Sequence, residues 1–505
     1  MPIVSMENCV KILANPQYPV LFTCGKKGQM VVTTEKPEEG IFFQLPNLTA
    51  EDFGDAEFKK TYGLKYALYG GAMANGIASS DMAIALGKAG CMGSYGSGGQ
   101  RLDVVSQEID KMKAALGEKP FLVNMLSNRN ADMEMKLAQL LIDKKVLGVE
   151  ASAYIVPSDA LVYFRVKGVH TDSDGKIVIP HKIIAKVSRE EVLEKFVSPP
   201  AAEAVAALLK AGLITAEEAA LAPKIPMADD ITAEADSGGH TDGRPMVSML
   251  PALIALANRK QAEFHYQQKV RVGAGGGVGT GLSCLGAFEM GAAYVVTGSV
   301  NQGCVESGTS DYVKQILAET AMADVTMAPC ADMFEMGAKV EVIKKKTMYA
   351  QNAQKLYEYY VKYPSFDAIP AADRDRIEKK ILRDSFDNIW AGTKDYFSRV
   401  DPSKIPQAER NPKLKMALVF RWYLGNSSRW AVQGDPSRKF DMQIWCGQSM
   451  GAFNLWVKGT PLEKAENRHV GEVANLLLNS CAYHYMKNLL IRVGVLAGVF
   501  QEDVL

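Results

Sequence analysis

The sequence predicts an α/β protein built on a (β/α)8 TIM barrel, with a small β-containing segment before the barrel and a helical subdomain after it. Two observations support this. Between residues 64 and 300, short apolar runs that end in glycine or small polar residues recur about eight times, and helical patterns follow them. Beyond about residue 330 the glycine-rich turns stop and helical periodicity takes over. We therefore divide the chain into residues 1–60, a barrel of 61–330 and a helical subdomain of 331–505.

The amino-terminal segment is expected to contain a β-hairpin. Apolar residues 20–22 and 30–32 flank a short glycine- and lysine-containing stretch, residues 25–28. Two apolar runs separated by a few residues that include glycine are typical of paired antiparallel strands. A small sheet should therefore precede the barrel.

The predicted barrel strands share one pattern, in which an apolar run ends in a turn and a helix follows. Successive strand–turn–helix units build a parallel sheet, and eight of them favour a closed barrel over an open sheet. The clearest runs are residues 65–69, 121–123, 182–187, 231–233, 270–272 and 294–296.

The carboxyl-terminal part is expected to be a packed helical subdomain. All five tryptophans lie there, and buried aromatic side chains on that scale indicate a core and not a tail. Residues 470–490 predict a final long helix. One helical face carries six large apolar residues: Ile377, Ile381, Leu382, Phe386, Ile389 and Trp390.

Composition excludes several classes of protein. Of the 505 residues 48% are apolar, and 57 basic side chains balance 57 acidic ones, whereas a disordered chain is poorer in apolar residues and a general nucleic-acid binder is basic. The most apolar stretch, residues 489–500, contains Arg492 and is shorter than the ~20 residues that cross a bilayer. The eight cysteines are scattered, and we see no secretion signal. We therefore expect a cytoplasmic protein without a metal site or disulfides.

The strongest functional signal is the sequence VGAGGGVGTG at residues 272–281. An apolar strand runs into consecutive glycines and then into a helix expected over residues 282–290. Backbone N–H groups at a helix start bind phosphate, because their partial positive charge meets the anion at close range. We predict that Gly275, Gly276 and Gly277 form a phosphate cradle; a tight turn without a ligand is the alternative.

The next strand end indicates which phosphate ligand is bound. The glycine loop has no strict G-x-G-x-x-G motif, and the following strand ends in Thr297, Gly298 and Ser299, not in the acidic residue that holds a ribose in dinucleotide-binding folds. Two adjacent strand ends that share one phosphate are typical of the last strands of a TIM barrel. We therefore expect a mononucleotide such as FMN.

A second motif, Asp236-Ser237-Gly238-Gly239-His240, follows the strand expected at residues 231–233. Paired glycines let the backbone pass close to a ligand, and histidine can donate a proton near neutral pH. A loop histidine in an ordinary hydrogen bond is the alternative. The position at a strand end favours a catalytic His240, because the catalytic groups of barrels lie at the carboxyl ends of strands.

Three weaker signals lie at other strand ends. Residues 71–74 are small enough for an aromatic ring to approach the backbone, although a plain turn would suit the same sequence. Asn124 carries an amide that can pair with a flavin edge. Lys186 is a cation suited to the negative N1 side of a reduced flavin, with an ordinary surface lysine as the alternative.

Together these segments resemble the nitronate monooxygenase-like FMN barrels, which include flavin-dependent enoyl reductases. Longer stretches look like the trans-acting enoyl reductases of the PfaD type, which serve polyunsaturated fatty acid synthases and trans-acyltransferase polyketide synthases. These stretches are ITAEADSGGHTDG at 231–243, RVGAGGGVG at 271–279, MADVTMAPCADMFEMG at 322–337 and MALVFRWYLGNSSRW at 416–430. The resemblance covers nearly all of residues 60–490.

The resemblance implies that NADPH, or alternatively NADH, reduces FMN, and that the flavin passes a hydride to the β-carbon of a 2-enoyl thioester on an acyl carrier protein. It implies that His240 donates a proton or polarises the thioester carbonyl, and Lys186 is the second catalytic candidate. The predicted cofactor contacts are Gly71, Ala72, Met73, Ala74, Asn124, Lys186, Asp236, Ser237, Gly238, Gly239, Gly275, Gly276, Gly277, Thr297, Gly298 and Ser299.

The histidine loop departs from the wider family, which usually has Glu-Ala before Gly-Gly-His where this chain has Asp236-Ser237. We expect Asp236 or Asp242 to orient His240. A nitronate-type flavin monooxygenase and a non-catalytic synthase component stay open as alternative functions. For the helical part three roles stay open: a cover for the barrel mouth, a homodimer interface or a surface for the carrier protein.

Overall fold

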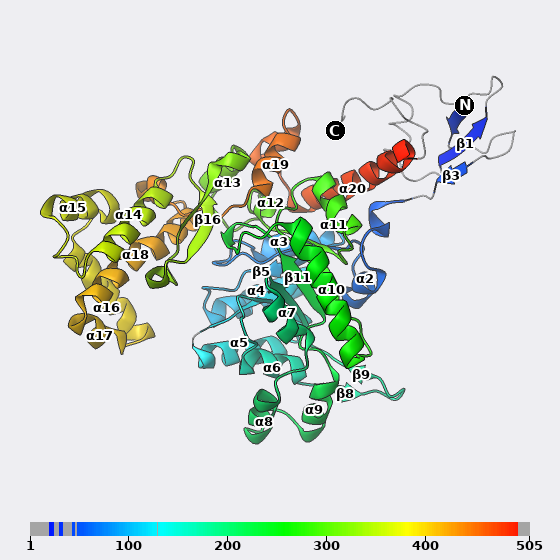
Figure 1. The fold of residues 1–505 in the computed structure, drawn as a ribbon, viewed down its shortest axis with the longest axis horizontal. Coiled ribbons are helices and arrows are strands. Elements are labelled where there is room, and N and C mark those ends of the chain that lie inside the picture. The colour runs from blue at the N-terminus through cyan, green and yellow to red at the C-terminus, as the bar shows by residue number, and fades with distance from the viewer. Residues whose placement is uncertain (1–19, 25–29, 34–42, 46–47, 129, 493–505) are drawn as a thin grey trace.

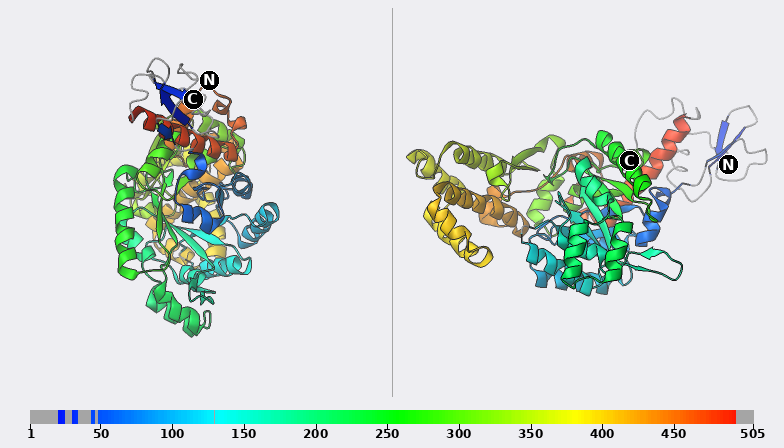
Figure 2. Two further views of the ribbon diagram at one scale, coloured as in Figure 1. Left: turned by 90° about the vertical axis from the view of Figure 1, so that its right-hand side faces the viewer. Right: turned by 60° about the horizontal axis from the view of Figure 1, so that its bottom comes forward.

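The computed structural model describes residues 20–24, 30–33, 43–45, 48–128 and 130–492. A barrel occupies the centre of the molecule, and a group of helices projects from one side of it (Figure 1). The right-hand view of Figure 2 shows the same elongated arrangement, with the helices projecting to one side of the barrel. Among these residues, no helix is long and apolar enough to cross a membrane.

The barrel is closed by eight parallel strands, so the predicted fold class is confirmed. The last strand pairs with the first, with Thr297 opposite Gly70. The strands are β4 (Leu68–Gly70), β5 (Met92–Tyr95), β6 (Leu122–Leu126), β7 (Gly148–Ser152), β10 (Lys182–Val187), β11 (Asp230–Glu234), β13 (Arg271–Gly275) and β14 (Val295–Thr297).

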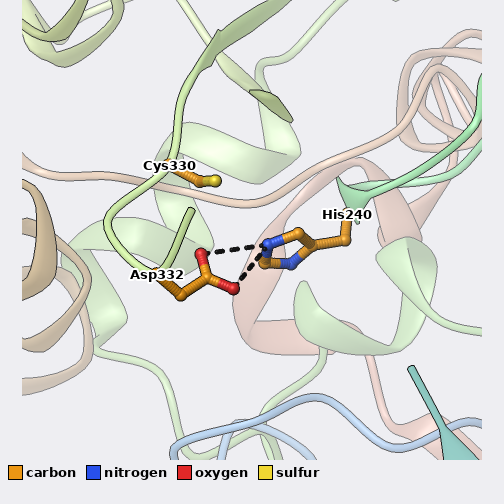
Figure 3. A group of neighbouring side chains, drawn as sticks. All are labelled: His240, Cys330 and Asp332. Carbon is orange, nitrogen blue, oxygen red and sulfur yellow. Dashed lines mark hydrogen bonds and ion pairs between the residues drawn. The ribbon is translucent and has the colours of Figure 1, made fainter. Parts of the chain in front are cut away.

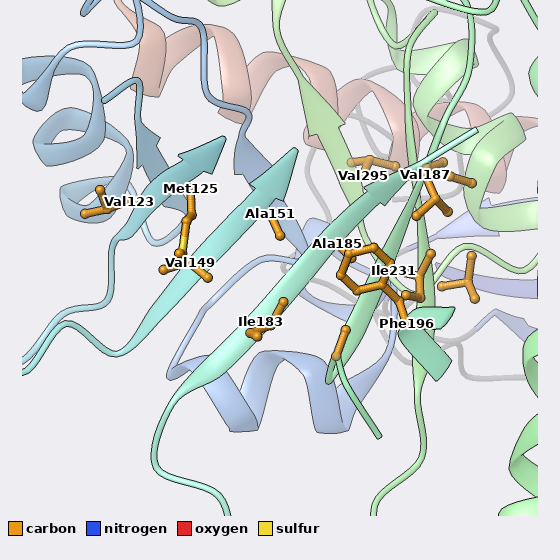
Figure 4. Close-up of a cluster of buried hydrophobic side chains, with 14 of the residues drawn as sticks. Val123, Met125, Val149, Ala151, Ile183, Ala185, Val187, Phe196, Ile231 and Val295 are labelled. Carbon is orange, nitrogen blue, oxygen red and sulfur yellow. The ribbon is translucent and has the colours of Figure 1, made fainter. Parts of the chain in front are cut away.

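Aliphatic side chains of neighbouring strands and of the outer helices form the main core (Figure 4). Ile183 of β10 lies opposite Val149 of β7 in the register, and both are fully buried. The helices that surround the strands are α3 (Ser80–Lys88), α4 (Leu102–Leu116), α5 (Ala131–Asp143), α6 (Asp159–Val166), α7 (Glu190–Val197), α8 (Ala202–Lys210), α9 (Ala216–Leu221), α10 (Met246–Phe264), α11 (Gly281–Glu289) and α12 (Ser299–Gln302). Helix α13 (Asp311–Ala318) follows them and belongs to a separate hydrophobic cluster.

The amino-terminal segment contains the predicted hairpin. Strand β1 (Val20–Cys24) pairs antiparallel with β2 (Met30–Thr33), and β3 (Phe43–Leu45) adds to its other side. Residues 25–28, predicted as the turn, lie outside the described residues. Helix α2 (Ala56–Tyr62) follows and contacts the amino-terminal ends of the barrel strands.

A buried polar network lies at this end of the barrel. Arg271 donates two hydrogen bonds to Asp230, at 2.6 and 3.0 Å, and Tyr62 donates a third to the same carboxylate at 2.7 Å. All three residues are buried, so each charge has a partner that compensates for lost hydration. Because this end lies opposite the strand ends that carry the predicted site, we assign the network to stability.

A second, three-stranded sheet connects the barrel to the projecting helices. It consists of β12 (Gly239–His240), β16 (Lys339–Ile343) and β15 (Val325–Pro329), paired antiparallel. The chain then forms α14 (Tyr349–Lys362), α15 (Ala371–Arg376), a π-helical turn (Ile377–Leu382), α16 (Phe386–Val400), α17 (Lys404–Arg410) and α18 (Pro412–Gln433). We call α14 to α18 the helical unit; it has a core of its own.

The predicted apolar face is buried in this core, but not on one continuous helix. Each of its six residues is at most 7% exposed. Arg383, with φ of 58°, adopts the left-handed conformation and ends the first helix, and α16 begins a few residues later.

The hydrophobic cores do not divide at residue 331, where the helical subdomain is predicted to begin. After the helical unit, α19 (Ser449–Trp456) and α20 (Val470–Arg492) return to the barrel. Leu477 and Cys481 of α20 belong to the barrel core, and α20 packs against α11. The last helix therefore stabilises the barrel, although it is far from the barrel in sequence.

The second sheet buries a carboxyl group. Glu341 of β16 is 4% exposed, and its Oε2 atom has no hydrogen-bond partner among the described residues. Burial, followed by the nearby charge of Asp236, raises the pKa of Glu341 to about 7. The carboxyl group therefore stays protonated in the folded protein at pH values where the unfolded chain has already released the proton.

This predicts a pH-dependent stability. Between pH 4.5 and 7 the folded state binds more protons than the unfolded state, so the free energy of unfolding falls as the pH rises through this window. Glu341→Gln cannot ionise and should be more stable than the wild type at pH 8, by about 1–3 kcal/mol, and similar to it at pH 4.5. Thermal melting at both pH values checks this, with Glu335→Gln as control. Equal shifts at both pH values would contradict it.

Candidate active site at the barrel mouth

The carboxyl ends of the barrel strands bring the predicted residues to one mouth. Residues 71–74 follow β4, residues 236–239 follow β11, and the glycine loop and residues 297–299 lie at the ends of β13 and β14. Asn124 and Lys186 lie within β6 and β10. Parallel strands in a closed barrel end on the same side, which is why these segments share a mouth.

The predicted phosphate cradle lies at two neighbouring strand ends. Strands β13 and β14 pair with Gly275 opposite Val296. Gly277 has φ of +74°, which side chains disfavour, and the nearest atom to a Cβ there would be 4.0 Å away. A Cβ on Gly298 would meet no described atom within 4 Å. Open space therefore adjoins backbone at both strand ends, as the phosphate of FMN requires.

A buried hydroxyl supports the fit to an anion. Ser237 Oγ is buried and has no hydrogen-bond partner among the described residues. Buried hydroxyl groups normally have a partner, so this atom can donate to a ligand. The loop of Ser237 contacts the glycine loop, because a Cβ on Gly276 would lie 2.8 Å from the Asp236 carbonyl oxygen.

Gly238 is required for the close packing of two backbone segments. A Cβ there would lie 2.7 Å from the backbone of Cys446. The segment 445–449, which we call the closing segment, runs from the end of the helical unit past the cradle. Its Gly447 N–H donates to Ser299 Oγ at 3.0 Å. No local sequence signal marks this segment, because its role arises only from contacts between distant parts of the chain.

Backbone hydrogen bonds hold the start of segment 71–74 to the adjacent strand β14 and to a side chain of β7. The Gly71 N–H donates to the carbonyl of Thr297 at 2.9 Å, and the Ala72 N–H donates to Glu150 Oε2 at 2.8 Å. The Asn124 amide donates to the backbone carbonyl of Glu150 at 3.0 Å. Sequence reasoning missed Glu150, since a single glutamate within a strand carries no motif.

Lys186 is not an ordinary surface lysine. Its Nζ atom lies 2.6 Å from Glu234 Oε1 and 3.5 Å from Glu150 Oε1, and its side chain is 16% exposed. Burial alone would lower the pKa of Lys186, but the two carboxylates outweigh burial and raise it above its usual range. The ammonium group is therefore charged and held at the mouth.

His240 forms an ion pair with Asp332 (Figure 3). Its Nε2 atom lies 3.1 and 3.2 Å from the two carboxylate oxygens, and Cys330 lies nearby. The hydrogen bond to Asp332 is the main cause that raises the pKa of His240 to about 10; contact with Cys330 adds to it and burial opposes it. Burial would raise the pKa of Asp332, yet the hydrogen bond from His240 lowers it to about 2. The imidazole is therefore protonated at neutral pH.

The expectation that Asp236 or Asp242 orients His240 is wrong. Asp242 instead accepts hydrogen bonds from Arg189, at 2.8 and 2.9 Å, and Asp236 accepts one from Thr241 at 3.4 Å. The correct partner, Asp332, is distant in sequence and reaches the histidine because β12 pairs with β16, which in turn pairs with β15 just before Asp332. Proximity in the sequence therefore does not identify the hydrogen-bond partner of His240.

His240, Cys330 and Asp332 form a group that could hold a metal ion. The donor atoms of His240, Cys330 and Asp332 all lie within 4.8 Å of one another. Nitrogen, sulfur and oxygen are the donors that zinc prefers, but the group supplies three ligands where a structural zinc site has four. The sequence does not reveal this group, because its three residues are scattered along the chain and meet only where the strands of the second sheet pair.

Two known families match the chain. The nitronate monooxygenase family matches residues 57–393, and the inserted helical domain of [acyl-carrier-protein] S-malonyltransferase matches residues 363–442, within the helical unit and the turn after it.

The curated relatives include polyunsaturated fatty acid synthase subunits and polyketide biosynthesis proteins. One of the polyunsaturated fatty acid synthase subunits of Thraustochytrium sp. is 46% identical over 420 residues, which are 82% of this chain and 28% of that protein. Polyketide biosynthesis protein PksE of Bacillus subtilis is 43% identical over 437 residues, which are 86% of this chain and 57% of that protein. The chain thus spans only part of the length of these relatives.

Solved structures agree with this grouping. The enoyl reductase domain of MlnA, from the macrolactin biosynthesis cluster of Bacillus amyloliquefaciens, is 37% identical with a TM-score of 0.83, over 87% of this chain and 99% of that domain. FabK from Thermotoga maritima, at 19% identity and a TM-score of 0.53 over 86% of this chain and 98% of that protein, shares the fold. The chain belongs to the nitronate monooxygenase family and, within it, to the trans-acting enoyl reductases of the PfaD type.

Proposed function

We propose that this chain is an FMN-dependent enoyl reductase that acts in trans in polyketide or polyunsaturated fatty acid biosynthesis. NADPH, or alternatively NADH, would be the reductant, and the substrate would be a 2-enoyl thioester on an acyl carrier protein. The observation that carries the proposal is the match to the MlnA enoyl reductase domain over 99% of its length. The geometry of the mouth supports it, with a glycine cradle and a charged histidine on adjacent segments.

The chain's own residues have distinct tasks in this reaction. Bound FMN would supply the hydride transfer from NADPH to the β-carbon of the thioester. Gly277, Gly298 and Ser237 would bind its phosphate. The protonated imidazole of His240 would donate the proton that the α-carbon requires or polarise the thioester carbonyl, and Asp332 would keep that imidazole charged and oriented.

The proposed partners follow from the relatives, which include a polyunsaturated fatty acid synthase subunit and a polyketide biosynthesis protein. A carrier-bound substrate must reach His240 at the second sheet, beside the helical unit, so we propose that the carrier protein approaches there. We also propose that the enzyme acts in the cytoplasm. A homodimer stays a prediction.

The first test follows the flavin absorbance of the purified protein without oxygen. NADPH should bleach the bands of oxidised flavin, and a crotonyl thioester should restore them, because the electrons then pass to the double bond. The saturated butyryl thioester is the matched control and should leave the bands bleached. A flavin that a nitronate bleaches and NADPH does not would favour a monooxygenase. A protein that cannot bind FMN would favour a non-catalytic component.

The second test separates the two half-reactions. His240→Ala should slow the reoxidation of reduced flavin by the thioester by about 10²-fold or more, while bleaching by NADPH is affected much less. Asp332→Asn should give a smaller loss of the same step, since the imidazole loses the charge that keeps it protonated. Asp242→Asn serves as the control, because Asp242 pairs with Arg189. Wild-type reoxidation by the His240 variant would refute its role as proton donor.

The third test concerns the phosphate cradle. Gly298→Val adds a side chain where no described atom lies within 4 Å of the Cβ, so it should crowd a ligand without crowding the protein. We expect at least tenfold weaker FMN binding, measured by fluorescence quenching, with little change in melting temperature of the protein without flavin. Gly286→Val, at another open glycine, is the matched control. Unchanged FMN affinity in Gly298→Val would place the phosphate elsewhere.

A further inference from the structure

Three predicted flavin contacts converge on one buried residue, Glu150, and two of them reach its carboxylate. Its Oε2 atom accepts the Ala72 N–H, its backbone carbonyl accepts the Asn124 amide, and its Oε1 atom faces Lys186. The Glu150 side chain is 0% exposed. The carboxylate therefore lies in the floor of the mouth, in contact with the residues expected to surround the flavin ring.

A second carboxylate faces the same lysine. Glu234 lies at the end of β11, its Oε1 atom is 2.6 Å from Lys186 Nζ, and its side chain is 26% exposed. The three residues come from the adjacent strands β7, β10 and β11. One ammonium and two carboxylates carry a net charge of −1 when all three are ionised, so Lys186 is more than neutralised by its neighbours.

We infer that Glu150 and Glu234 reverse the electrostatic effect expected of Lys186, and that this cluster holds bound flavin at a low midpoint potential. The inference rests on the proposed function. A lone ammonium would stabilise the electron-rich reduced ring, whereas a net negative charge opposes the uptake of electrons, and most strongly where water is excluded. Reduced flavin would then be a stronger hydride donor to the enoyl thioester, which receives both electrons.

The cluster also explains why the lysine is retained at a negative site. Without a cation between them, the buried carboxylate of Glu150 and the partly exposed carboxylate of Glu234 would repel each other. The ammonium group of Lys186 lies between the two carboxylates and attracts both, so its task is to hold Glu150 and Glu234, and through Glu150 the Ala72 backbone. Glu150, Lys186 and Glu234 are thus positioning residues in this inference.

The test measures the midpoint potential of FMN in the holoenzyme, by equilibration with a reference dye during stepwise anaerobic reduction. Glu234→Gln removes one negative charge and retains the shape, so the equilibrium should shift towards reduced flavin by about tenfold, or about 30 mV for two electrons. Glu234→Asp retains the charge and should stay close to the wild type. Glu335→Gln, which pairs with Arg421 in the helical unit, is the matched control.

Glu150→Gln provides a second route to the same charge change, because its amide oxygen can still accept the Ala72 N–H. A raised potential in either glutamine variant, with Glu234→Asp and the control unchanged, supports the inference. An unchanged or lowered potential in both glutamine variants, with FMN retained, overturns it, even where NADPH and the thioester still bleach and restore the flavin bands. A wild-type flavin that NADPH cannot bleach refutes the proposed function instead.

Discussion

Closure of the barrel between β14 and β4 is the constraint on which the mouth depends. The register places Thr297 opposite Gly70, and the Gly71 N–H donates to the Thr297 carbonyl at 2.9 Å. The first and last loops of the barrel are joined in this way, although most of the barrel sequence separates them. Because all eight strands are parallel, every loop with a predicted cofactor contact then opens on the same side.

The glycines around the mouth are needed for two different physical reasons. Gly238 and Gly279 allow backbone to approach backbone, since a Cβ on either would collide with the closing segment. Gly277 and Gly298 instead adjoin open space. A glycine motif in the sequence therefore does not say whether a glycine allows close packing or leaves room for a ligand. The surrounding structure distinguishes the two cases.

The helical unit is joined to the histidine loop, residues 236–240, through the second sheet. His240 belongs to β12, whereas Asp332 follows β15, and β16 lies between these strands and continues towards the helical unit. After the helical unit the closing segment returns to the cradle and α20 returns to the barrel core. The region that follows the barrel strands thus supports the site from two directions, and the barrel core is incomplete without the last helix.

The sequence by itself determined the barrel, the hairpin and the strand ends at which the candidate residues lie, because these depend on local periodicity and on where apolar runs end. It also predicted the burial of the face from Ile377 to Trp390, though not the break at Arg383. Only the tertiary structure decided that Asp332 pairs with His240, that Glu150 and Glu234 compensate Lys186, and that the closing segment requires Gly238. These contacts join residues far apart in the chain, and they exist only because parallel strand ends converge and a second sheet pairs across the mouth.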